Sequence, residues 1–548
     1  MNKKFILCSL LALSLFCNSK IKANTIVSAP LDSRPISMEY LENLCELEGD
    51  LLLTPSKDIL DFYSEEIENQ ANSKEVRKFI YETVKKHNTK DTTVIINSAS
   101  YVTNGLIGSR QNKNYKDINE AFKDLSYLTS TFTNPYYYFN ITIPRTLVDF
   151  RGSGEVYPQG SYKGLKFFKE GKGLVNYEDL LLEREYVLIK AKCGYTLTDW
   201  ENEFLKEYSN LKENHEEIYR NIYNLFVKSL YIPNIEVIVT VDDYQLPNYY
   251  RSLIKQNKGD FIPTDCNSNP IKFSYSFYYQ EEMKNYIRKT YGTDFLNEFL
   301  TGSNNRVNMI YGTDEVSQLI YARDLSRRKS KGVYYTINYD YSSPYSDIAI
   351  GIYDNNTLDN IFTNGANFVN HNQIKEKDFT FFINRYADTV CEKKNELAYE
   401  ISKGGNIGLL EMYSMDNIAQ GSNDLFTLLS SKGLLQNLKV YNSWNTYANT
   451  INLGLAQSQV YMLADKKDKE DKNTKLLIQN VLEGGVYAGQ LKGSFNKKDY
   501  DINRYYSKVL TDKLSNNLAF SSFKEDYNIV ASFPWERKFE CYIKVIKK

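Results

Sequence analysis

Short apolar runs rich in β-branched and aromatic residues alternate with helical patterns along the chain, and this alternation constrains the fold most. The predicted strands are residues 25–29, 51–54, 93–97, 137–143, 236–241, 307–310, 333–337, 347–352, 407–412 and 438–441. The predicted helices between them include residues 73–86, 197–226, 316–328, 380–401 and 449–464. Strand–helix alternation of this kind predicts an α/β fold in which helices cover both faces of parallel sheets.

A chain of 548 residues is long enough for two or three domains. We expect two parallel-sheet (β/α) domains, 24–328 and 329–548, which meet at the charged stretch 327–332 and form a cleft at the strand C-terminal ends. The Glu-, Lys- and Tyr-rich region at about 152–231 predicts a helical insertion. Residues 466–475 predict a solvated loop or frayed helix end, and residues 529–548 a closing strand pair.

The first residues predict the compartment. Lys3 and Lys4 precede an apolar run at 5–16, and small Ala23 follows a polar segment, which is the order of a secretory signal peptide cleaved near Ala23. The run is too short to span a membrane, and no later apolar stretch is longer. The sequence therefore predicts a secreted or cell-envelope protein with no transmembrane segment in the mature chain. Cys17 would favour a lipoprotein instead, but bulky Phe16 precedes it where a small residue is needed.

Charge and composition exclude several classes of function. With 67 basic and 68 acidic residues the chain has no basic excess for nucleic acid. Its 3 His are scattered, which argues against a His-rich zinc site. The five cysteines after residue 23 form no Cys-x-x-Cys pair, so we expect them to be small buried hydrophobic residues. No cofactor is predicted, although carboxylates would allow a divalent cation.

Polar residues follow the predicted strands at the ends where α/β enzymes place their chemistry. Two turns carry adjacent carboxylates, Asp242/Asp243 and Asp314/Glu315, and such a like-charge pair costs stability unless a cation, Arg or ligand offsets it. These four residues are the predicted catalytic groups, with Asp242 or Asp243 as nucleophile or base and Asp314 or Glu315 as general acid. The predicted substrate-binding residues are Asp32, Arg34, Asn104, Arg110, Arg145, Trp444, Asn445 and Asn449.

Carboxylates that converge on one site suit more than one chemistry. The first is glycoside hydrolysis, in which one carboxyl group donates a proton and another stays ionised. The second is a divalent-metal hydrolase with oxygen ligands. The third is an extracellular protein that binds glycans without cleaving them. The sequence favours a secreted, carbohydrate-active hydrolase. A single Asp after a strand can also simply cap the next helix, and Trp444 can be a core residue.

The same landmarks, in this order, resemble the bacterial domain-of-unknown-function family 4127. The resemblance is carried by Pro30-Leu-Asp-Ser-Arg-Pro35, Asn104-Gly-Leu-Ile-Gly-Ser-Arg110, Asp242-Asp243, Gly312-Thr-Asp-Glu-Val316, Tyr441-Asn-Ser-Trp-Asn-Thr-Tyr-Ala-Asn-Thr450 and Pro534-Trp-Glu-Arg-Lys-Phe-Glu540. It implies no established activity, but it supports a functional reading of the residues in these motifs. The turn at 98–101 departs from the family, whose members carry an acidic residue and a Gly-Gly pair there. If the missing carboxylate is catalytic in relatives, the departure implies altered specificity or lost activity in this chain.

Overall fold

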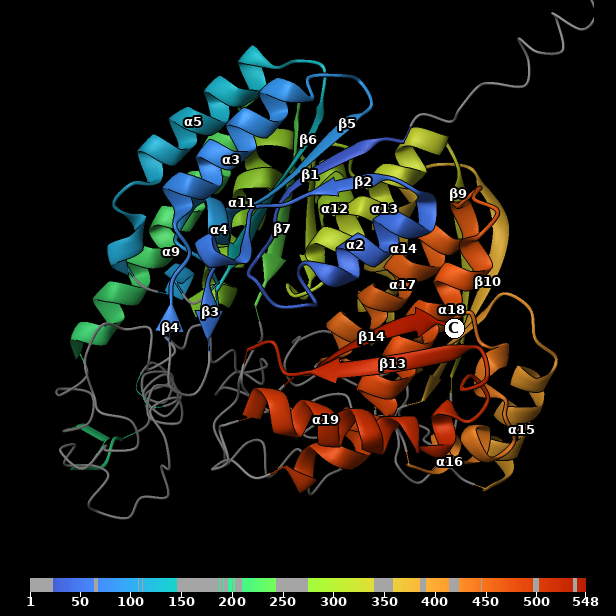
Figure 1. Cartoon of the computed structure of the whole chain (residues 1–548). Coiled ribbons are helices and arrows are strands. Elements are labelled where there is room, and N and C mark those ends of the chain that lie inside the picture. Colours follow the sequence, from blue (N-terminus) through green and yellow to red (C-terminus); the bar gives the residue numbers. More distant parts are fainter. Residues whose placement is uncertain are drawn as a thin grey trace, which may run out of the picture.

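The structure is a computed structural model that describes residues 23–63, 68–106, 108–110, 112–144, 187, 191, 196–199, 201–202, 209–242, 275–339, 358–384, 391–412, 423–444, 446–495, 502–535 and 540–548. Within these residues the fold is α/β with two parallel sheets, as the sequence predicts (Figure 1). The predicted signal peptide lies outside them. No helix among the described residues is both long and apolar enough to cross a membrane.

The first sheet has the strand order β2-β1-β5-β6-β7-β8, and every neighbouring pair is parallel. Its strands are β1 (Thr25–Ala29), β2 (Leu51–Leu53), β5 (Thr92–Asn97), β6 (Tyr136–Ile143), β7 (Ile235–Val241) and β8 (Val307–Tyr311). The order reverses at β1, which has β2 on one side and β5 on the other. Ligands of open α/β sheets bind beyond the carboxyl ends of the strands at such a reversal.

The second sheet has the order β12-β11-β10-β9 and is also parallel. Its strands are β9 (Gly332–Tyr339), β10 (Lys375–Asn384), β11 (Ile407–Glu411) and β12 (Val440–Asn442). Two antiparallel hairpins accompany the sheets: β3 (Phe62–Tyr63) with β4 (Glu68–Asn69), and β13 (Tyr527–Ser532) with β14 (Tyr542–Lys547).

Helices lie on both faces of each sheet, and one helical layer is shared. The outer face of the first sheet packs on α3 (Ser73–Lys86), α5 (Ile118–Thr131), α9 (Ser209–Ser229), α11 (Tyr275–Tyr291) and α12 (Thr293–Thr301). Its inner face is covered by α2 (Glu39–Glu48), α13 (Val316–Lys329) and α14 (Leu358–Asn370), which share one hydrophobic core with α17 (Tyr447–Leu463). Of these helices, α14 and α17 also contact strands of the second sheet. The far face of the second sheet packs on α15 (Cys391–Ser402), α16 (Asn423–Ser431), α18 (Lys469–Asn480), the π-helix η8 (Val481–Leu491) and α19 (Ile502–Ser515).

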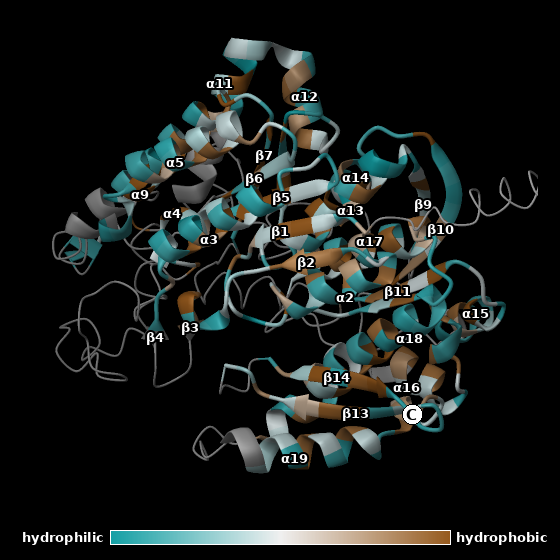
Figure 2. Ribbon diagram, turned by 45° about the horizontal axis from the view of Figure 1, so that its top comes forward, coloured by the Kyte–Doolittle hydropathy of each residue, from teal (hydrophilic) through white to brown (hydrophobic). Residues whose placement is uncertain are grey.

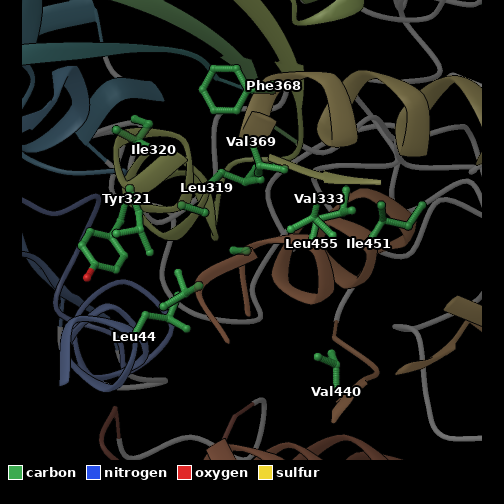
Figure 3. Close-up of a cluster of buried hydrophobic side chains, with 14 of the residues drawn as sticks. Leu44, Leu319, Ile320, Tyr321, Val333, Phe368, Val369, Val440, Ile451 and Leu455 are labelled. Carbon is green, nitrogen blue, oxygen red and sulfur yellow. The ribbon is translucent and has the colours of Figure 1, made fainter. Parts of the chain in front are cut away.

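The shared layer explains the composition of α17. Every residue of this helix is buried, and it has no polar stripe, because the second sheet lies on one side of it and the helices α2, α13 and α14 cover the other (Figure 2). Ile451 and Leu455 of α17 lie near Val333 of β9 and Val369 of α14 in one hydrophobic cluster (Figure 3). That cluster also contains Ile26 of β1, so a single core joins the two sheets. The division into domains at residues 328 and 329 stays a prediction.

A buried ion-pair network fixes α13 to the amino end of the first sheet. Arg323 is fully buried and donates Nε to Oε1 of Glu236 at 2.6 Å. Its two remaining nitrogens donate to the carbonyl oxygens of Phe368 and Asn304, each at 2.7 Å. Because Glu236 lies near the start of β7, this network is at the opposite end of the strands from the predicted site, and its role is structural.

The structure corrects one element and refines another. The predicted helix at 380–401 is wrong in its first part, where β10 runs from Lys375 to Asn384 and α15 begins only at Cys391. Short apolar runs are ambiguous between helix and strand, and here Phe379 and Phe381 face the shared layer while Phe382 faces the far side. Within the lysine-rich stretch 466–475, α18 begins at Lys469, with ion pairs such as Lys472–Asp468 at 3.0 Å. The predicted closing strand pair is confirmed by β13 and β14.

Other predictions from the sequence concern regions that the structure describes only in part. The predicted strand at 347–352 and most of the insertion at 152–231 lie outside the described residues, although α9 within the insertion is a helix. Cys45 and Cys541 are free and buried, as expected of small hydrophobic residues.

Candidate functional site

The loop that leaves β1 buries its charged side chains. Arg34 donates Nε to Oδ2 of Asp32 at 2.8 Å and its backbone N–H to Oδ1 of the same carboxylate at 3.0 Å. Its guanidinium also binds Asp314, in the loop after β8, with Nη2 to Oδ1 at 2.7 Å and Nη1 to Oδ2 at 3.3 Å. The structure thus brings together three residues that the sequence picks out separately, across 280 positions of the chain.

The charges around Arg34 are unbalanced. Burial by itself lowers the pKa of Arg34, but the negative charges of Asp314, Asp32 and Glu540 raise it well above its ordinary value. The guanidinium therefore stays charged and holds a cluster in which acidic groups outnumber it. An acidic excess in a buried site is costly unless some carboxyl groups are protonated or a ligand compensates.

Asp61, which the sequence analysis did not pick out, is the carboxyl group with the clearest sign of protonation. It is buried, and its pKa is raised well above the ordinary value, first by burial and then by the charge of Asp32, against a lowering effect of Arg34. Its Oδ2 accepts the backbone N–H of Leu106 at 3.0 Å, whereas Oδ1 has no partner among the described residues. Gly105 has φ +102°, and a Cβ there would lie 2.3 Å from Cγ of Asp61. The side chain of Asp61 can therefore approach the backbone at this position only because the residue is glycine.

The C-terminal segment completes the same cluster. Trp535 donates Nε1 to Oγ of Ser33 at 2.9 Å, and Ser33 donates in turn to the carbonyl of Asp61 at 2.6 Å. The Trp535 ring lies 5.4 Å from the centre of the Arg34 guanidinium, within cation–π distance. Residues more than 500 positions from the β1 loop therefore fix its conformation.

Glu315 and Asn449 come together where β8 and α17 meet. Glu315 is fully buried, and its Oε1 accepts from Nδ2 of Asn452 at 2.8 Å. A Cβ on Gly312 would lie 2.3 Å from that Oε1 and 2.9 Å from Oδ1 of Asn449, so both oxygens pack against the glycine. The side-chain amide of Asn449 is buried and has no partner within the described part of the chain.

Two predicted binding residues have other surroundings. Trp444 lies in a small hydrophobic cluster with Ile36, Tyr40 and Leu453, and its Nε1 has no partner in the described structure. Asn104 has φ +62°, and its side chain joins its turn to the start of α3, where Oδ1 accepts from the backbone N–H of Ser73 at 3.2 Å. Asn104 thus stabilises the turn that presents Gly105 to Asp61.

The other predicted residues are only partly described. Asp242 directly follows β7 and is buried, and its backbone N–H donates to the carbonyl of Ile143 at 2.9 Å. Asp243, Arg145 and Asn445 lie outside the described residues, as does the side chain of Arg110. The 98–101 turn that departs from the family forms the buried helix α4 (Ser98–Val102), capped by the side chain of Asn97.

Another buried carboxyl, Glu483, lies in the π-helix η8. It accepts a hydrogen bond from the Tyr40 hydroxyl, and its pKa is raised to about 8, first by burial and then by the charge of Glu540, while the Tyr40 bond lowers it. Gly484 follows, and a Cβ there would lie 2.7 Å from the carbonyl of Ser443. Neither Asp61 nor Glu483 follows a parallel strand, so the strand-end rule could not have found them.

We expect Glu483 to make folding stability fall as pH rises. Its folded pKa of about 8 exceeds the ordinary value of 4.5, so between these pH values the folded state holds a proton that the unfolded state releases. The free energy of unfolding should decline there by at most about 1.4 kcal/mol per pH unit from this group. Glu483→Gln cannot ionise, so urea unfolding at pH 5 and pH 8.5 should show it close to wild type at pH 5 and more stable at pH 8.5.

Glu525→Gln is the matched control, because Glu525 is exposed and lies in the same half of the chain. It should follow the wild-type pH dependence. If Glu483→Gln followed that dependence too, the carboxyl would not be protonated in the folded protein.

Within the described residues, no group of three or more His, Cys, Asp and Glu side chains is arranged to hold a metal ion. What the described arrangement offers chemically is acid–base contrast: two carboxylates paired with Arg34 lie beside a third whose pKa is raised. Environments that push the pKa values of neighbouring carboxyl groups apart are typical of sites with one acid and one ionised group.

Comparison with known proteins identifies the family of the chain but no activity. No curated protein and no solved structure matches it. The family described as "Protein of unknown function (DUF4127)" matches residues 26–163 and 273–544. Asp242-Asp243 lies outside the matched residues. The match includes the β1 loop, the Asp314 turn, the α17 turn and the C-terminal segment, and it confirms the resemblance to this family seen in the sequence. The chain therefore belongs to the DUF4127 family.

Proposed function

We propose that this protein is a secreted hydrolase that cleaves glycosidic bonds by carboxylate acid–base catalysis. The observation that carries the proposal is the contrast between Asp61, whose pKa is raised, and Asp32 and Asp314, which are both ion-paired with Arg34. Glycosidases need such a contrast, because one carboxyl group protonates the leaving oxygen while a second stays ionised.

The roles differ from those expected from sequence alone. Asp61 is a better general acid than Asp314, because both oxygens of Asp314 accept from Arg34. Asp32 and Asp314 would then stabilise the positive charge that develops on the sugar ring in the transition state. Asp242 and Asp243 keep the predicted role of nucleophile or base, since Asp242 follows β7 at the same edge of the sheet and Asp243 is the next residue of the sequence.

The test is release of saccharides from a panel of bacterial-envelope and host glycans, read by mass spectrometry with and without EDTA. Purified protein should release product in the presence of EDTA, and Asp242→Asn with Asp243→Asn should abolish release. Product release that EDTA abolishes would favour the divalent-metal hydrolase. Saturable glycan binding without any product would favour the non-catalytic alternative, and either outcome would contradict the proposal.

A further inference from the structure

The inner face of the first sheet carries a buried row of neutral polar side chains near the carboxyl ends of its central strands. We call this row the polar strip; it consists of Ser28 of β1, Asn97 of β5, Asn140 and Thr142 of β6, and Thr240 of β7. All five are at most 2% exposed. They continue the alternation of Ile26, Ile95, Tyr138 and Ile238, which face the shared helical layer. The apolar belt of the sheet therefore gives way to hydroxyl and amide groups at the end where the candidate site lies.

Hydrogen bonds run along the polar strip in one direction. The Thr240 hydroxyl donates to Oδ1 of Asn140 at 3.0 Å, and Nδ2 of Asn140 donates to Oγ1 of Thr142 at 3.1 Å. The Thr142 hydroxyl donates to Oδ1 of Asn97 at 3.4 Å. The bonds thus lead from β7 to β6, along β6 from Asn140 to Thr142, and on to β5, where they end at the amide of Asn97. Bonds in such a chain polarise one another, which strengthens the donor at its end.

The polar strip ends in two groups that the described structure leaves without partners. Oδ1 of Asn97 also accepts the backbone N–H of Ala99 at 3.0 Å, which fixes the amide orientation and turns Nδ2 away. Neither that Nδ2 nor Oγ of Ser28 has a hydrogen-bond partner among the described residues. A buried polar atom left unpaired costs about 1–3 kcal/mol, so two on adjacent strands call for an explanation.

The position of the unpaired Ser28 and Asn97 groups in the sheet supplies an explanation. Ser28 pairs in register with Ile95, so Ser28 and Asn97 lie on the same face of neighbouring strands, two residues apart in register. These strands, β1 and β5, flank the reversal of strand order in the first sheet. The unpaired groups therefore lie at the point where open α/β sheets bind ligands. The loop after β1, with Asp32 and Arg34, begins two residues beyond Ser28.

The chemistry of these groups selects the ligand. The polar strip contains no charged side chain, and the guanidinium of nearby Arg34 is already engaged by two carboxylates. Within the part of the chain that the structure describes, an anionic sugar would have no free cation beside the polar strip to bind. An uncharged sugar hydroxyl can accept from Nδ2 of Asn97 while it donates to or accepts from the Ser28 hydroxyl.

We infer that the polar strip binds adjacent hydroxyl groups of an uncharged sugar ring, with Ser28 and Asn97 as the contacting residues. The inference rests on the proposed function for the class of ligand. Because these side chains are buried, the ligand reaches them only when the covering segments move, and association is correspondingly slow.

The experiment is equilibrium binding to an array of neutral, sulfated and uronate-containing glycans, with wild type and Asp61→Asn compared. The best-bound neutral glycan is then titrated against Ser28→Ala. Ser28→Ala removes an unpaired hydroxyl, so its melting temperature should equal or exceed that of wild type, while its affinity should fall about tenfold. A purely structural role for Ser28 would not lower affinity without lowering stability.

Thr93→Val is the control, and we expect it to change stability and affinity in the opposite way to Ser28→Ala. Thr93 is a buried residue of β5 whose hydroxyl bonds Oδ2 of Asp324 at 2.9 Å, far from the carboxyl ends. Its loss should lower the melting temperature and leave glycan affinity unchanged. Binding of anionic glycans alone, binding of none, or an unchanged affinity in Ser28→Ala would each overturn the inference. If neutral glycans bind and Ser28→Ala weakens them but nothing is cleaved, the inference stands and the proposed hydrolase does not.

Discussion

Arg34→Met should destabilise the protein by about 3–5 kcal/mol at pH 7, because it leaves Asp32 and Asp314 buried without their cation. At low pH, protons neutralise the buried negative charge that Arg34 no longer offsets, so the deficit grows as pH rises through the acidic range and shrinks as pH falls toward 4. Denaturant unfolding of variant and wild type at pH 4.5 and pH 7 measures this.

Arg77→Met is the matched control. Arg77 is as buried as Arg34, but its partner Asp124 is 48% exposed, so the carboxylate that it leaves behind is hydrated. Arg77→Met should therefore cost less and should not recover at low pH. Equal losses in the two variants at both pH values would show that the acidic cluster around Arg34 is not under electrostatic stress.

Asp61→Asn should lower kcat on the glycan substrate by about 10²–10⁴-fold with little change in KM, because asparagine cannot donate a proton to the leaving oxygen. The variant should fold normally, since its amide oxygen can still accept the backbone N–H of Leu106. The wild-type rate should fall as pH rises through the raised pKa of Asp61, and the residual rate of the variant should lack that limb.

Asp58→Asn controls for this substitution, since Asp58 is an exposed carboxylate three residues earlier in the chain. It should leave kcat unchanged. A wild-type kcat in Asp61→Asn would remove Asp61 from the mechanism and leave Asp314 or Glu315 as the acid, as the sequence first suggested.

The sequence predicted much of the candidate site because strand ends are readable from local patterns. Asp32, Arg34 and Asp314 follow β1 and β8, and the structure joins them directly. Glu315 and Asn449 follow β8 and β12 and meet at Gly312. Asp61 and Glu483 escaped prediction because they lie beside a short hairpin and in a π-helix, where no strand-end rule applies.

The sequence by itself determined the α/β class, the family and most strand positions. These follow from hydrophobic periodicity and from motif residues that are contiguous in the chain, so no knowledge of distant contacts is needed. The misassigned β10 marks the limit, because a short apolar run is compatible with helix and strand alike until the layers around it are known.

Only the tertiary structure decided the rest. It showed that α17 is buried between the second sheet and three helices, that Trp535 and Glu540 reach the β1 loop, and that the sheet order reverses at β1. It also revealed the raised pKa of Asp61 and the unpaired ends of the polar strip. Burial, charge environment and hydrogen-bond satisfaction depend on which distant segments surround a residue, and that information is not local in the sequence.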